Sequence, residues 1–159
     1  MIQQQQKIAI IGSFQRFYPQ VLEAINVFAR AGVDVTSPLG SAIVREGQFV
    51  RFQSDPEGWS AAQIQSAALA KIFEADIAFV VAPGGYVGRS TCYEIGRLTQ
   101  ARKPIVFSEA PNDLPIAAPD THVMPAAALA RLILGGDRIA WVHGDVGDEF
   151  DALERRLTA

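Results

Sequence analysis

Two runs of consecutive apolar residues constrain the fold of this chain most strongly. "KIAIIG" (7–12) ends at a glycine and "ADIAFVVAP" (75–83) ends at a proline. Apolar runs without polar alternation are typical of strands buried on both faces, as in the parallel sheets of α/β proteins. We therefore predict that both runs are strands inside a sheet with helices on either side.

Helical patterns separate these runs from two shorter strands. "SAAQ" (60–63) fits a capping box and marks the start of one helix. Strands alternating with helices predict a single-domain α/β protein, with a doubly wound, Rossmann-like or flavodoxin-like sheet that is mostly parallel. The further strands are expected at 33–38 and 103–109, and the helices at 20–32, 60–74, 90–101, 125–136 and 148–158. The domain is expected to span 7–159, after a disordered glutamine-rich tail over 1–6. Residues 39–59 admit two interpretations, a short hairpin around Glu46-Gly47 or a long ordered loop.

Charge and cysteine content exclude several classes of function. The net charge of −3 gives no electrostatic footprint for a nucleic acid polymer, and no basic block suits a membrane surface. Cys92 is the single cysteine, and His122 and His143 stand apart from it, so no zinc spacing is present. We expect no metal or cofactor. Without a signal-peptide pattern or a membrane-spanning run, the expected location is the cytoplasm.

The carboxyl ends of the predicted strands indicate where a ligand would bind. In open α/β sheets, ligands occupy the crevice outside these ends. Gly12, Pro38 and the loop 83–90 each follow a strand, so three loops share one rim. The candidate substrate-binding residues in these loops are Gly12, Ser13, Phe14, Arg16, Gly84, Gly85, Tyr86, Gly88, Arg89 and Ser90.

The glycine-rich run "PGGYVGRST" (83–91) itself has two interpretations. Its glycines let the backbone approach a ligand, Arg89 suits a phosphate or carboxylate, and the next helix offers free amides. Alternatively, the glycines only shape a tight turn and Ser90 is the helix cap. Its spacing fits neither the phosphate loop of nucleotide hydrolases nor the dinucleotide fingerprint.

Glu94 is the candidate catalytic carboxylate, and it also has two interpretations. "TCYE" (91–94) fits a capping box in which Glu94 reaches back to the amide of Thr91. A carboxylate in the first turn of a helix is also well placed as a nucleophile, with a pKa that the helix amides lower.

The segment 75–107 resembles the nucleoside 2-deoxyribosyltransferase family, including its N-glycosidase relatives that cleave nucleoside 5′-monophosphates. The resemblance lies in Ala75-Asp76, the glycine-rich loop, "YEIG" (93–96) and Lys103-Pro104, and "IIGSF" (10–14) resembles the opening loop. It implies that Glu94 attacks C1′ of the sugar and forms a covalent glycosyl intermediate, which water or a second base resolves. It implies a small-molecule nucleoside or nucleotide as substrate, with no metal or redox cofactor. It also implies a homo-oligomer, in which Asn112 and Asp113 complete a neighbour's pocket.

The chain departs from that family at one position. The family commonly carries an aspartate eight residues before the Ala-Asp aspartate, and here that position is Ala68. Asp55 is the nearest carboxylate that can substitute as the second catalytic acid, and Gln65 lies one turn earlier in the helix. Asp76 is expected to cap or begin its strand. The absence of the expected carboxylate leaves an alternative, a non-catalytic module that binds or senses a nucleotide.

Several weaker features complete the candidate site. "PGGYVGRST" followed by glutamate also resembles the signature of cytokinin-activating phosphoribohydrolases, with two extra residues, and that resemblance implies the same N-glycosidic chemistry. The histidines and Cys92 are expected to be structural. The aromatic candidates for stacking on a base or lining the sugar pocket are Phe14, Tyr18, Phe49, Phe52, Trp59 and Tyr86.

Overall fold

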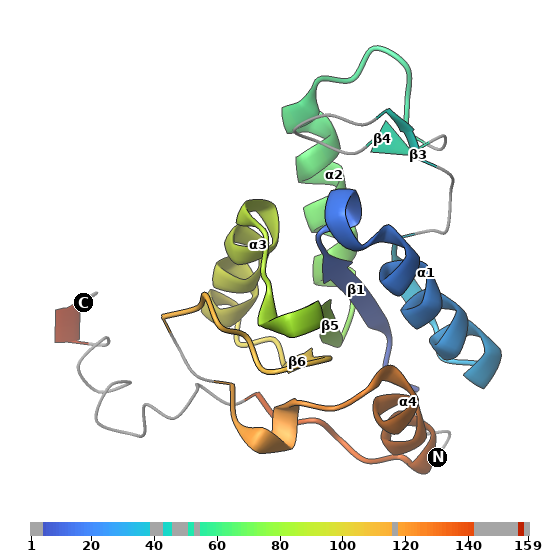
Figure 1. Ribbon diagram of the computed structural model, residues 1–159, viewed down its shortest axis with the longest axis vertical. Helices are drawn as coiled ribbons and strands as arrows, with labels where there is room; N and C mark the ends of the chain where they lie inside the picture. Colours follow the sequence, from blue (N-terminus) through green and yellow to red (C-terminus); the bar gives the residue numbers. More distant parts are fainter. Residues whose placement is uncertain are drawn as a thin grey trace.

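A four-stranded parallel sheet forms the centre of the molecule (Figure 1). The computed structural model describes residues 5–38, 43–45, 51–52, 55–115, 118–141 and 156–157. The strand order β2-β1-β5-β6 places the first strand inside the sheet, as in flavodoxin-like folds. The strands are β1 (Ile8–Gly12), β2 (Val35–Ser37), β5 (Ile77–Val81) and β6 (Ile105–Phe107).

Four helices cover the two faces of the sheet. They are α1 (Phe14–Ala31), α2 (Ala61–Glu74), α3 (Arg89–Gln100) and α4 (Ala126–Gly135). One core cluster joins α1 and α4 to the sheet through Phe28 and Leu129, and the other joins α2 and α3 through Ile72 and Leu98. The doubly wound α/β fold is therefore confirmed, with helices on both faces.

The apolar runs are explained by this double cover. Along β1, Ile8 and Ile10 face the first cluster, while Ala9 and Ile11 face the second. All five residues of β1 are buried, as are all five of β5. Because successive side chains point to opposite faces, a strand between two helical layers needs apolar residues at every position.

Helix α1 begins earlier than the sequence pattern indicates. The prediction placed its start after Pro19, but helical structure begins at Phe14. Phe17 has non-helical dihedrals (φ −129°, ψ 34°), so a single turn precedes the long helix. Pro19 consequently lies near the start of that long segment, where a missing N–H costs little.

The segment 39–59 contains the predicted hairpin pairing. Strands β3 (Ile43–Arg45) and β4 (Arg51–Phe52) are antiparallel, with Ile43 opposite Phe52. The described residues do not include the turn around Glu46-Gly47 or the side chains of Phe49 and Phe52. They also leave out most of the predicted helix 148–158, of which 156–157 are described and helical. Among the described residues, no helix is both long and apolar enough to span a membrane.

Ser60 caps helix α2 as the sequence predicts. Its side chain accepts a hydrogen bond from Gln63 N (3.2 Å), and the Gln63 side chain accepts one from Ser60 N (2.8 Å). We expect Ser60→Ala to lower the free energy of unfolding by about 1 kcal/mol, because the Gln63 amide loses its side-chain acceptor. Urea denaturation measures this change. Ser90→Ala is the matched control, since Ser90 is exposed and is not a cap; equal losses in the two variants would contradict the capping role.

Candidate active site

The loops after β1 and β5 meet at the carboxyl edge of the sheet. These strands are parallel neighbours, with Gly12 opposite Val81, so both loops leave at the same edge. A Cβ added at Gly12 would lie 2.9 Å from Val81 O, and one added at Gly88 would lie 3.6 Å from Ser13 Cβ. Two of the three predicted rim loops therefore meet, with Ser13 directly beside Gly88, and the residues that follow Pro38 lie outside the described ranges.

Arg16 and Tyr86 form the second contact between these loops. The Arg16 guanidinium carbon lies 4.4 Å from the centroid of the Tyr86 ring and 5.5 Å from that of Phe17. The two rings pack edge to face at 5.7 Å. Arg16 is exposed, so its N–H groups remain accessible beside the rim. Phe14 is partly buried and packs against the core cluster that α1 and α4 form with the sheet.

The glycine-rich loop is closed by hydrogen bonds rather than open to a ligand. Residues Pro83–Gly85 form the 3₁₀ turn η1, in which Gly85 N bonds Ala82 O and Tyr86 N bonds Pro83 O. The other two N–H donors of the segment 82–86 are also used: Ser108 Oγ accepts from Ala82 N (2.8 Å) and Glu109 Oε2 accepts from Gly84 N (2.9 Å).

Asn112 lies against the loop of its own chain. Its backbone N donates to Gly85 O (2.9 Å), and its Nδ2 donates to Gly84 O (2.8 Å). Sequence reasoning named Asn112 as a possible ligand contact and did not find Ser108 or Glu109. The signal available was their position directly after β6, the parallel neighbour of β5, because that position puts them at the same rim.

Gly85 is the residue of this loop that least tolerates a side chain. Its φ is 77°, and an added Cβ would lie 2.5 Å from Asn112 Nδ2 and 2.6 Å from Ala110 O. We expect Gly85→Ala to lower the free energy of unfolding by about 1–3 kcal/mol, because strain and overlap with backbone coincide there. Chemical denaturation measures the loss. Gly84→Ala is the control, since φ is also positive (63°) but nothing lies within 4 Å; a larger loss for Gly84→Ala would contradict the steric argument.

Helix α3 begins at Arg89, three residues earlier than the capping-box interpretation requires. Gly88 is the N-cap, no side chain caps the helix, and the first intrahelical bond runs from Cys92 N to Gly88 O. The capping box of Thr91 and Glu94 is therefore wrong, and so is the cap role of Ser90. Arg89 and Ser90 are exposed in the first turn. Thr91 is buried and turns inward.

Glu94 lies in the second turn of α3, on the border of its buried face. It is one helical turn from Thr91 and from Leu98, which are both buried. Gly88 and Glu94 are separated by roughly 9 Å along the helix axis, and the side chain tilts back toward the rim. No described residue donates a hydrogen bond to the Glu94 carboxylate or forms an ion pair with it.

Burial raises the pKa of Glu94 to about 7. The prediction of a lowered pKa is wrong, because the carboxylate sits beyond the first turn, where the helix amides act, and loses hydration without gaining a partner. At neutral pH the group is therefore divided between its ionised and protonated forms.

The remaining carboxylates play different parts. Asp76 directly precedes β5, and its Oδ2 accepts a hydrogen bond from Lys7 N (2.8 Å), the residue that directly precedes β1. Asp76 therefore joins the starts of these two neighbouring strands. Asp55 is partly buried between β4 and α2. Figure 1 shows the β3–β4 hairpin at the end of the molecule where α1 and α2 begin, which is the end that carries the rim. Ala68 is partly buried on α2, one turn from Ile64 and from Ile72, which both face the core.

The histidine and cysteine predictions are resolved in part. His122 is buried, with Nδ1 3.0 Å from Thr121 Oγ1 and Nε2 2.8 Å from Ala140 O, so it has a structural role. Burial, and after it the Asp113 carboxylate, raises the pKa of the Cys92 thiol. His143 lies outside the described residues. Within the described ranges, no group of three or more His, Cys, Asp or Glu side chains suits a metal ion.

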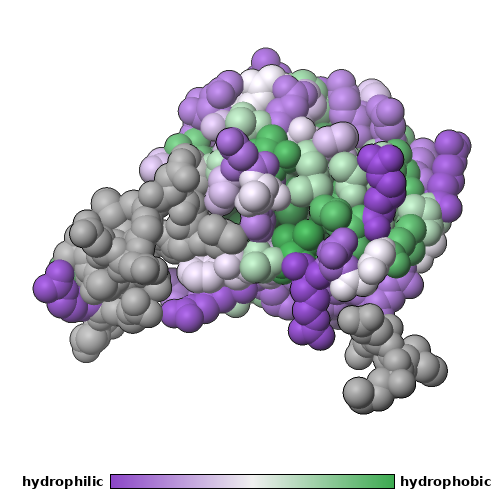
Figure 2. All heavy atoms as spheres, turned by 90° about the horizontal axis from the view of Figure 1, so that it is seen from below, coloured by the Kyte–Doolittle hydropathy of each residue, from purple (hydrophilic) through white to green (hydrophobic). Residues whose placement is uncertain are grey.

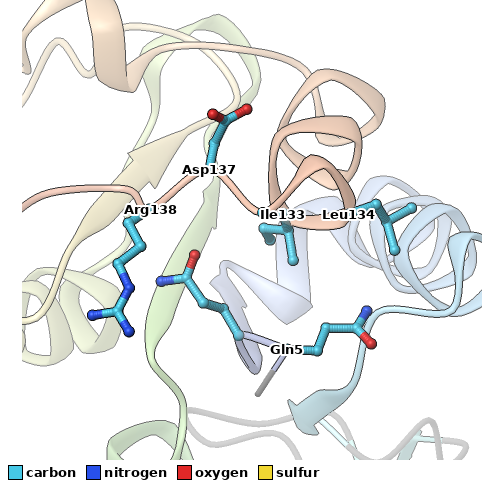
Figure 3. Close-up of a pocket in the computed structure, with 7 residues that line it drawn as sticks. Gln5, Ile133, Leu134, Asp137 and Arg138 are labelled. Atoms are coloured by element: carbon cyan, nitrogen blue, oxygen red, sulfur yellow. The ribbon is translucent and has the colours of Figure 1, made fainter. Parts of the chain in front are cut away.

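A pocket of about 240 Å³ lies at the other end of the sheet, beside the start of β1 (Figure 3). Ile133 and Leu134 of α4 line it together with Asp137 and Arg138, and the buried Gln6 Oε1 has no partner there among the described residues. Figure 2 shows this end of the molecule, where apolar side chains lie among polar ones. Ligands of open α/β sheets bind at the carboxyl edge, so the rim remains the candidate site.

None of the known protein families, curated proteins or solved structures compared with the chain matches it.

Proposed function

We propose that this chain cleaves the N-glycosidic bond of a nucleoside or nucleoside 5′-monophosphate, with Glu94 as the nucleophile. The observation that carries the proposal is the state of that carboxylate: it is desolvated, has no partner among the described residues, and lies on the helix that begins at the rim. A desolvated carboxylate without a structural partner is unfavourable for folding, and such groups cluster at functional sites.

The chemistry proceeds in two displacements at one carbon. In the first, a Glu94 oxygen bonds to C1′ of the sugar, the C1′–N bond breaks, and the base leaves with the electron pair and takes up a proton. In the second, water attacks C1′ and releases the sugar and the Glu94 carboxylate, or a second base attacks and completes transfer. The transition states resemble an oxocarbenium ion, which an adjacent carboxylate stabilises.

A pKa of about 7 matches this role at neutral pH. The ionised form is the nucleophile, so the active fraction rises as the pH passes through 7. The protonation of the departing base needs a second acid, and Asp55 is our candidate because it lies in the segment at the same end of the molecule.

The side chains at the rim suit the rest of such a substrate. Ser13 and Ser90 offer hydroxyls for a sugar or phosphate, Arg16 and Arg89 are exposed cations, and Tyr86 presents an aromatic ring. The substrate is a small molecule, no cofactor takes part, and the working form is a cytoplasmic homo-oligomer in this proposal.

A second candidate function is a module that binds a nucleotide without cleaving it. The observation that favours it is Ala68, which cannot ionise and lies on α2 where a second carboxylate is expected for catalysis. Binding at the rim then needs Arg16 and Tyr86, but not the charge of Glu94.

One experiment separates the two functions. The protein is incubated with a panel of nucleosides and nucleoside 5′-monophosphates, and free base is followed by chromatography. Release of a base supports cleavage and identifies the substrate. If no compound releases base but some raise the unfolding temperature, the binding module replaces the enzyme.

A further inference from the structure

One segment after β6 holds the glycine-rich loop from the side. Four of the loop's backbone polar groups bond to Ser108, Glu109 and Asn112, through three side chains and one backbone N–H. We call residues Ser108–Asn112 the clamp segment. None of its side-chain contacts to the loop is a consequence of sheet pairing, so the residue types themselves provide them.

We propose that Glu109 and Asn112 are positioning residues that fix Tyr86 and Gly88 at the rim. The proposal rests on the proposed function only for its effect on catalysis, because the placement of the loop is a property of the fold. In this proposal, neither side chain contacts the substrate.

Glu109 and Asn112 bind the backbone N–H and the backbone carbonyl of the same residue, Gly84. The Glu109 carboxylate accepts from Gly84 N, and Asn112 Nδ2 donates to Gly84 O, so the peptide planes on both sides of Gly84 are fixed. Gly84 has a φ of 63°, a conformation that is not maintained by helix or sheet pairing. Both side chains are exposed and make no ion pair with a described residue, so these bonds are their polar contacts in the described chain.

The effect reaches the opposite loop through packing. Gly85 is locked by Asn112 N, and the next residue, Tyr86, places its ring against Phe17 and under the Arg16 guanidinium. Gly88 then lies beside Ser13. A shift at Gly84 therefore moves the residues through which the loops after β1 and β5 meet.

A carboxylate on Gly84 N also directs where an anionic ligand binds. The donors of 82–86 are already occupied, and Glu109 adds a negative charge at this end of the loop. An anionic group of a substrate is consequently directed away from Gly84, toward the side of the rim that carries Arg16.

Amide exchange in ¹⁵N-labelled protein tests the placement directly. In Glu109→Ala, we expect the Gly84 amide to exchange about tenfold faster, the value that corresponds to one lost hydrogen bond, and the Tyr86 and Gly88 signals to shift. In Asn112→Asp, which loses the donor to Gly84 O but keeps the Gly84 N bond, we expect the same two signals to shift. Glu109→Gln should restore the wild-type values, because its amide oxygen still accepts from Gly84 N. Glu74→Ala is the matched control, since Glu74 is an exposed glutamate paired with Lys71 on α2.

Kinetics tests the functional part on the compound that releases base most rapidly in the panel. We expect Glu109→Ala to lower kcat/KM by on the order of tenfold while the protein remains folded at the assay temperature, and Glu109→Gln to recover it. If Glu109→Ala leaves Gly84 exchange unchanged, or speeds it without shifting the Tyr86 and Gly88 signals, the positioning role is overturned. If exchange is faster and the signals shift but kcat/KM stays at the wild-type value, the effect on catalysis is overturned. Absence of base release in the wild type overturns the proposed function instead, and the exchange data still decide whether the clamp exists.

Discussion

Replacing Glu94 with glutamine is expected to reduce base release by on the order of 10³-fold or more. The side chain keeps its size and its place on α3, but an amide oxygen is a poor nucleophile and does not form the glycosyl ester. Losses of this size are typical when the group that forms the covalent bond is removed. The rate of base appearance under saturating substrate measures the effect.

Glu74→Gln is the control for this experiment. It makes the same chemical change on an exposed glutamate of α2 that pairs with Lys71 at 3.1 Å, away from the rim. Mass spectrometry of the quenched wild-type reaction should find the sugar on the peptide that contains Glu94, and none in the variant. A Glu94→Gln protein that still releases base at the wild-type rate would remove the nucleophile from the proposal.

The stability of the wild-type protein is expected to depend on pH through the Glu94 carboxylate. Its pKa is raised from 4.5 to about 7 in the folded state, so between these values the folded protein holds a proton that the unfolded chain releases. The contribution of Glu94 to stability is therefore greatest below pH 4.5, falls as the pH rises, and is fully lost above pH 7. The loss amounts to about 3 kcal/mol.

Urea denaturation at pH 5 and pH 8 measures this contribution when the wild type is compared with Glu94→Gln. Other groups titrate identically in both proteins, so the difference between the two pH profiles isolates Glu94. We expect the variant to gain stability relative to the wild type by about 3 kcal/mol from the lower pH to the higher. Parallel profiles would mean that the carboxylate is hydrated, and would remove the physical basis for its assignment, whatever the substrate panel shows.

The central strands of the sheet could be predicted from sequence because each is an uninterrupted run of apolar residues. β1 and β5 lie between two helical layers, so every position had to be apolar, and the two runs are visible without any structure. The start of α1 could not be predicted in the same way. Pro19 is a strong helix-start signal, and the single turn before it depends on the unusual dihedrals of Phe17, which no residue preference encodes.

The position of Glu94 on the rim helix was predictable, but its environment was not. A capping box and a helix start at Gly88 differ by only three residues in sequence, and glycine is itself an acceptable N-cap. The desolvation of Glu94 depends on packing between elements, so the sign of its pKa shift needed the structure. The clamp segment was missed for a related reason, since its side-chain bonds join residues 25 to 28 positions apart.

The outer edges of the sheet have a consequence for how copies of the chain can associate. β6 is three residues long, and its open side is bridged in parallel by Val123, with Met124 N donating to Phe107 O at 2.9 Å. β2 at the other edge is also three residues long and is followed by Pro38. Short edges that are partly covered make poor templates for strand addition. Growth of a continuous intermolecular sheet from either edge is therefore disfavoured, whatever surface copies of the chain use to meet.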